Sequence, residues 1–119
     1  MDISKENESK IQQLQSIEQN LGQFLQQKQQ LHAQQIEIES GIKELGNTNK
    51  AYKIVGNIMV AMDQDKLKAE LGDKKKIVDM KLSAIEKHEE NLKDKAKSIQ
   101  ENIMGSVENE DSKGKENKE

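Results

Sequence analysis

The sequence contains no cysteine and no proline, and it is nearly free of aromatic side chains. Without cysteine it has neither a disulfide framework nor a thiolate metal site. Without proline, no residue of the chain introduces the kink or break that proline causes in a long helix. Aromatic residues make up 2% and hydrophobic residues 32% of 119 residues, which is little for a compact core. These absences leave two possibilities, a disordered chain or a helical rod whose apolar residues form a narrow seam.

Long apolar runs and a large net charge are also missing. No stretch has the length of hydrophobic residues that crosses a bilayer, and the opening "MDISKENESK" lacks the hydrophobic core of a signal peptide. The formal net charge of −3 gives no general attraction to nucleic acid or anionic membranes. We therefore expect a cytoplasmic protein that binds neither a membrane nor nucleic acid. A nucleic-acid-binding coil remains an alternative that the acidic balance opposes.

The sequence also lacks recognisable catalytic and metal-binding motifs. His32 and His88 are isolated from each other and from any residue at ligand spacing, so both are expected on a helix surface. No phosphate loop, nucleophile–base pair or paired-carboxylate pocket can be assembled. The sequence predicts no catalytic residue, no metal, no cofactor and no enzymatic activity.

The first part of the chain carries a heptad repeat. Five apolar residues at seven-residue intervals define the d positions, and a second series three residues earlier defines the a positions. Lys28 and Gln35 interrupt the a series. They mark either a loose or locally specified part of the seam or polar residues that its edge tolerates. The d residues are Ile17, Phe24, Leu31, Ile38 and Leu45, and the apolar a residues are Leu14, Leu21 and Ile42.

The second part repeats the design, with Lys75 and Glu89 as its interruptions. Its d residues are Leu71, Val78, Ile85, Leu92 and Ile99, and its apolar a residues are Leu82, Ala96 and Ile103. Two heptad helices joined by one short segment predict a mainly α fold, a long antiparallel two-helix coiled coil with one β-hairpin inserted between the helices.

The predicted boundaries follow from caps and composition. We expect an N-terminal coiled-coil helix over 1–46, a β-hairpin insert over 47–64, a C-terminal coiled-coil helix over 65–105 and a disordered polar tail over 106–119. Asp63 or Asp65 is the expected N-cap of the second helix, and Gly105 its expected end.

The insert "AYKIVGNIMVAM", residues 51–62, is the one densely apolar segment in an otherwise polar chain. Gly56-Asn57 between two strand-like runs suits a type II′ turn, because glycine adopts the positive φ of the first turn position. That register places Val55 opposite Ile58 and Ile54 opposite Met59, with Lys53–Val60 and Tyr52–Ala61 as further pairs.

Both faces of this hairpin are mostly apolar, and an isolated two-stranded hairpin is only marginally stable in water. We therefore predict that it pairs with equivalent hairpins of other chains. The alternative is a hairpin folded back on its own coil. The predicted oligomer interface consists of Tyr52, Ile54, Val55, Gly56, Ile58, Met59 and Val60.

"YKIVG" followed by "IMV" between two heptad helices resembles the beta class of the prefoldin family, archaeal type, over about residues 8–104. "QQKQQL" at 26–31 and "KAEL" at 68–71 are also similar. The resemblance implies a subunit of a hetero-hexamer, two alpha and four beta, whose partners are a prefoldin alpha-type subunit and other beta copies. It also implies an ATP-independent holdase that captures unfolded client proteins with its coiled-coil tips and passes them to a group II chaperonin.

Carried onto this chain, that function needs apolar side chains where the two helices end. Such residues lose their seam partners where the coil frays, and several weak contacts together give avidity. A coiled-coil adaptor or tether without client binding is the alternative, with the same fold. The predicted client-binding residues are Ile3, Ile11, Leu14, Ile99, Ile103, Met104 and Val107.

Overall fold

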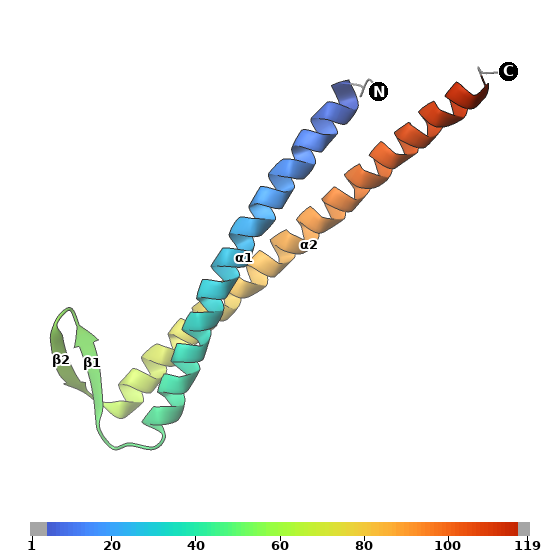
Figure 1. Ribbon diagram of the computed structural model, residues 1–119. Coiled ribbons are helices and arrows are strands. Elements are labelled where there is room, and N and C mark those ends of the chain that lie inside the picture. Colours follow the sequence, from blue (N-terminus) through green and yellow to red (C-terminus); the bar gives the residue numbers. More distant parts are fainter. Residues whose placement is uncertain (1–4, 117–119) are drawn as a thin grey trace. The chain divides into compact units, whose positions relative to one another are not determined.

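The computed structural model describes residues 5–116, with side chains through Ser106. It contains helix α1 (Lys5–Leu45), strands β1 (Ala51–Val55) and β2 (Ile58–Met62), and helix α2 (Gln64–Glu116), in that order (Figure 1). The chain divides into two compact units, which are described separately below. The hairpin unit comprises Gln26–Ile85, and the terminal unit comprises Met1–Leu25 with Glu86–Glu119. The predicted fold class, two long helices with one β-hairpin between them, is confirmed.

Within the hairpin unit, α1 and α2 run antiparallel. Gln35 Nε2 donates to Asp79 Oδ1 at 2.8 Å, and Lys75 Nζ lies 3.6 Å from Glu39 Oε1. A Cβ on Gly41 would lie 3.3 Å from Leu71 Cδ1. Residue numbers thus fall along α1 as they rise along α2, which is the pairing expected of a helical hairpin.

The heptad prediction accounts for which side chains are buried. In the hairpin unit the most buried seam residues are Leu45 at 7% exposed, Val78 and Leu82 at 6%, and Ile85 at 8%. The polar interruptions Gln35 and Lys75 are half-buried and reach across the seam through the contacts above. They therefore act as cross-links on one side of the coil.

In the terminal unit the seam is more polar. Ile17 and Ile99 are buried at 5% and 8% exposed, but so are Asn7 at 4% and Glu89 at 7%. Phe24 stacks on the His88 ring with centroids 5.9 Å apart and planes inclined by 12°. Polar groups lower the gain from burying a seam, because each must keep a hydrogen-bond partner.

The helix ends differ from the prediction in one place. Asp63 occupies the N-cap position of α2, since its carbonyl accepts the first intrahelical bond from Leu67 N at 3.0 Å. The predicted helix end at Gly105 is wrong, because α2 continues as helix to Glu116. A glycine costs an exposed helix only about 1 kcal/mol, and no proline follows it. The predicted disordered tail, 106–119, was based on composition, and side chains after Ser106 lie outside the described residues.

The chain leaves α1 through a tight turn and enters the hairpin. Gly46 N donates to Lys43 O at 3.1 Å and Asn47 N to Glu44 O at 3.0 Å, which closes the last turn of α1. Gln64 Nε2 donates to the carbonyl of Leu45, the last residue of α1, so the first residue of α2 caps the end of α1. Both helix ends at the hairpin are therefore held together by short local bonds.

Candidate assembly and binding surfaces

The hairpin has the predicted register. Lys53 pairs with Val60, Ile54 with Met59, and the strands are antiparallel throughout. Gly56 has φ of +63°, and no other described residue has a positive φ. Positive φ at the first turn position alone is the signature of the predicted type II′ turn, whose twist matches that of the strands.

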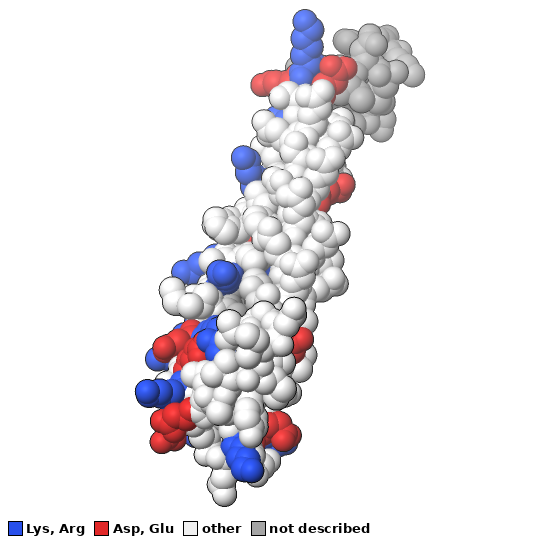
Figure 2. All heavy atoms as spheres, turned by 90° about the vertical axis from the view of Figure 1, so that its left-hand side faces the viewer, with Lys and Arg blue, Asp and Glu red and all other residues white. Residues whose placement is uncertain are grey.

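The two faces of this hairpin expose large apolar side chains. On one face, Ile54 is 71% exposed, Met59 66% and Tyr52 51%; on the other, Ile58 is 66% exposed, Val55 56% and Val60 45%. Figure 2 views the hairpin from its outer side, where its surface is uncharged and bordered by charged residues. A cluster of this kind is typical of a surface that another protein covers.

The hairpin touches the helices of its own unit through the first residues of β1. Ala51 is 6% exposed and lines a hollow with Leu67 and Leu71, whereas the exposed residues lie toward the turn. Figure 1 shows both strands to one side of the helix ends, beside the first turns of α2. In the described structure the coil of the same unit therefore leaves the apolar side chains toward the turn uncovered.

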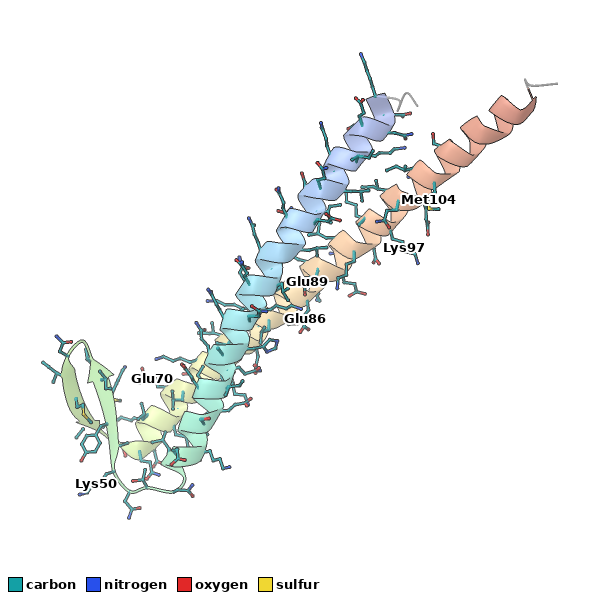
Figure 3. All side chains as sticks on the ribbon, in the orientation of Figure 1. Lys50, Glu70, Glu86, Glu89, Lys97 and Met104 are labelled. Carbon is teal, nitrogen blue, oxygen red and sulfur yellow. The ribbon has the colours of Figure 1, made fainter. Side chains whose placement is uncertain are left out.

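An ion pair fixes the hairpin on α2. Lys53 Nζ donates to Glu70 Oε1 at 2.5 Å, and Lys74 Nζ lies 3.9 Å from the same oxygen. Figure 3 labels Glu70 on the side of α2 that faces the strands. The hydrogen bond from Lys53, helped by the charges of Lys53 and Lys74, lowers the pKa of Glu70 despite opposing desolvation. The sequence analysis missed this contact, because nothing in the spacing relates a strand lysine to a helix glutamate.

The predicted client-binding residues differ in their exposure. Met104 is 62% exposed, and Figure 3 shows it on α2 directed into solvent. Ile11, Leu14 and Ile103 are half-buried, and Ile99 is buried at 8% exposed. Ile3 and the side chain of Val107 lie outside the described residues.

Residues 5–116 contain no group of three or more histidine or acidic side chains that could hold a metal ion. None of the described helices combines the length and the hydrophobicity that crossing a bilayer requires.

Among residues 5–116, the only strands form one exposed apolar β-hairpin between the two long helices. The family described as prefoldin subunit matches residues 8–110. The chain belongs to the prefoldin family. Its membership confirms the resemblance drawn from "YKIVG" and the heptads, and the family is one of chaperone subunits rather than a known enzyme family.

Similar prefoldins include two archaeal proteins named prefoldin subunit beta. The protein of Thermococcus kodakarensis is 32% identical over 98 residues, which cover 80% of this chain and 84% of that one. The protein of Methanothrix thermoacetophila is 28% identical over 103 residues, covering 84% and 86%.

A solved structure is also similar, that of the prefoldin beta subunit from Thermococcus strain KS-1. It superposes with a TM-score of 0.82 at 29% identity and covers 88% of this chain and 95% of its own. The likeness covers most of the chain, so it supports the beta class that the sequence resemblance indicated.

Proposed function

We propose that this prefoldin chain is a holdase subunit that captures non-native polypeptides without ATP and passes them to a group II chaperonin. It acts in a hetero-hexamer of two alpha-type and four beta-type subunits, joined through the hairpins. The observation that carries this proposal is the exposed apolar hairpin of one unit; the other unit adds exposed or half-buried apolar residues toward its helix ends.

The hairpin supports the assembly part. Burying one Ile- or Met-sized side chain contributes about 1.5–3 kcal/mol, and six such residues are 45–71% exposed on this short element. The strands also have free edges, since the sheet contains β1 and β2 alone. Unpaired edges and apolar faces together favour pairing with further strands.

The terminal unit supports the client part. Met104 is flexible, polarizable and exposed, which suits contact with many different apolar surfaces. Ile103 and Leu14 are half-buried and become available when the ends of the seam separate. Each contact is weak, so useful affinity requires several subunits of one assembly to hold the same client.

The test compares two methionines of similar exposure. The chain is assembled with an archaeal alpha-type prefoldin subunit and added in near-stoichiometric amount to a refolding enzyme without ATP, and light scattering is recorded. Wild type is expected to suppress the scattering, Met104→Asp to suppress it less, and Met80→Asp, 72% exposed in the hairpin unit, to match wild type. Equal suppression by both variants contradicts the assignment of Met104.

The same experiment addresses the second candidate function, an adaptor that only oligomerises. The exposed hairpin favours that function equally, since both functions need assembly. An assembled complex that suppresses no aggregation at all would identify an adaptor and overturn the holdase proposal. Transfer to the chaperonin is tested separately, by the recovery of enzyme activity when a group II chaperonin and ATP are added afterwards.

A further inference from the structure

The two flanks of the helix pair in the hairpin unit are built differently. Heptad e positions lie on one flank and g positions on the other. On the e flank, Gln35–Asp79 at 2.8 Å and Lys75–Glu39 at 3.6 Å bridge the helices. On the g flank the structure instead has two hollows of about 390 and 350 Å³, which adjoin at Gln34 and Lys81.

We call these two adjoining hollows the open groove. Its floor is apolar: Leu31 and Ile38 are half-buried seam residues that remain partly accessible from this side, and the buried Val78 and Ile85 lie beneath. Ile77, at 52% exposed, stands on its α2 edge outside the seam positions. The heptad pattern does not require an apolar residue at Ile77, since that position faces solvent in a two-helix coil.

The edges of the open groove carry an asymmetric charge. Lys74 and Lys81 line the α2 edge and are seven residues apart, which is two helical turns. Lys74 also lies 3.9 Å from Glu70, a surface ion pair of small energy that a second carboxylate can share. The α1 edge offers the amides of Gln27, Gln30 and Gln34 and one carboxylate, Glu37.

We propose that the open groove docks an amphipathic helix of another protein, with acidic residues along one border of its apolar stripe. A straight apolar channel between two helices fits a third helix through residues spaced i, i+3, i+4 and i+7. Carboxylates seven residues apart on that helix reach both Lys74 and Lys81. Glu37 on the opposite edge favours a neutral or basic residue there, which sets the direction of the bound helix.

This interaction is separate from the proposed chaperone function. The open groove contains neither the hairpin residues of the oligomer interface nor the predicted client-binding residues of the terminal unit. Its binding can therefore be measured on the full-length chain, whether or not the protein suppresses aggregation.

The test uses two fluorescein-labelled synthetic helices of about three heptads with identical apolar stripes. One carries Glu at heptad spacing along one border, and the other carries Lys there. Fluorescence anisotropy at low salt is expected to show the Glu helix binding at least about tenfold more tightly. Lys81→Glu should remove that preference, because Lys74 and the new carboxylate then leave the α2 edge without net charge. Lys76→Glu, an exposed lysine that lines neither hollow, should leave it unchanged.

A second pair of variants tests the groove itself. Ile77→Asp is expected to abolish binding of the Glu helix, whereas Met80→Asp, three residues along the same helix and 72% exposed, should not affect it. Circular dichroism checks that both variants keep their helix content. Equal binding of the two synthetic helices, no binding, or equal effects of the two variants overturns the proposal. A change of native mass in Ile77→Asp alone also overturns it, because the occupant is then another prefoldin subunit.

Discussion

The seam and the hairpin of this prefoldin chain are built from the same types of aliphatic side chain, which are buried in the seam and exposed in the hairpin. Val78, Leu82 and Ile85 are 6–8% exposed in the seam, whereas Ile54 and Ile58 are 71% and 66% exposed in the hairpin. The seam residues are covered by a partner helix of the same chain. The hairpin strands have no second layer, so their apolar surface is covered only when another molecule supplies it. We therefore expect stability of the coil and assembly of the oligomer to depend on different residues.

Substitutions in the hairpin should have the largest effect, and this effect should be on assembly. Ile54→Asp with Ile58→Asp places two charges in the proposed interface, where an unpaired buried charge is strongly unfavourable. We expect the hexamer with an alpha-type partner to be lost while the helix content of the chain persists. Native mass spectrometry measures the assembly and circular dichroism the helices.

The control for this pair is Ile36→Asp, because Ile36 is 63% exposed on α1 in the same unit. Its variant should assemble normally. A hexamer that survives the two hairpin substitutions would contradict the assignment of the interface.

The seam should respond in the opposite way. Leu82→Ala removes a side chain that is 6% exposed and should destabilise the helix pair by about 2–5 kcal/mol. Met80→Ala, two residues away and solvent-exposed, should change the stability by less than about 0.5 kcal/mol. Urea unfolding monitored by circular dichroism measures both. Similar midpoints for the two variants would mean that the seam does not hold the helices together.

A smaller effect is expected at the hairpin turn. Gly56→Ala leaves the surroundings uncrowded, since a Cβ there would meet nothing within 4 Å, but it places alanine at φ of +63°. The strain is about 1–2 kcal/mol. Amide exchange in β1 and β2 should accelerate by about 5–30-fold, which is the population change that this energy produces.

Gly72→Ala provides the contrast for that measurement. A Cβ on Gly72 also meets nothing within 4 Å, but Gly72 is helical and has no positive φ. It should stabilise α2 by about 1 kcal/mol and leave exchange in the strands unchanged. Unchanged strand exchange in Gly56→Ala would indicate that the turn tolerates a different geometry.

The smallest effect should come from the ion pair between the hairpin and α2. The pKa of Glu70 is lowered from its ordinary value of 4.5, so its contribution is present above that pH and is lost as the pH falls through the lowered pKa. Glu70→Gln should lower the melting temperature slightly at neutral pH, and the difference from wild type should shrink at about pH 3. Glu39→Gln is the control variant, because Glu39 pairs with Lys75 and not with the hairpin. A difference that grows on acidification would contradict the pairing with Lys53.

Much of this fold follows from short-range spacing. The series Ile17–Phe24–Leu31 predicted the buried stripe of α1, and Gly56-Asn57 predicted the turn and hence every strand pair, because heptads and two-residue turns set geometry over a few residues. The end of α2 was predicted less well. Gly105 was interpreted as a stop, but a single glycine without a following proline leaves the helix free to continue.

The surfaces could be predicted only in part. The exposed hairpin followed from its own composition, whereas the exposures of Ile99 and Met104 depend on which side of α2 each residue occupies in the terminal unit. The Lys53–Glu70 contact and the open groove were not predicted. Both depend on the direction in which side chains from separate elements turn.

The sequence by itself determined the two heptad helices, the hairpin between them, its register and its unpartnered apolar surface. These properties arise from neighbours along the chain. Only the tertiary structure decided that Gln35 and Lys75 bridge one flank and leave the other open, and that Glu70 holds the hairpin base. The physical reason is that a heptad fixes which residues face the partner helix, but not to which side a polar seam residue reaches for its hydrogen bond or ion pair.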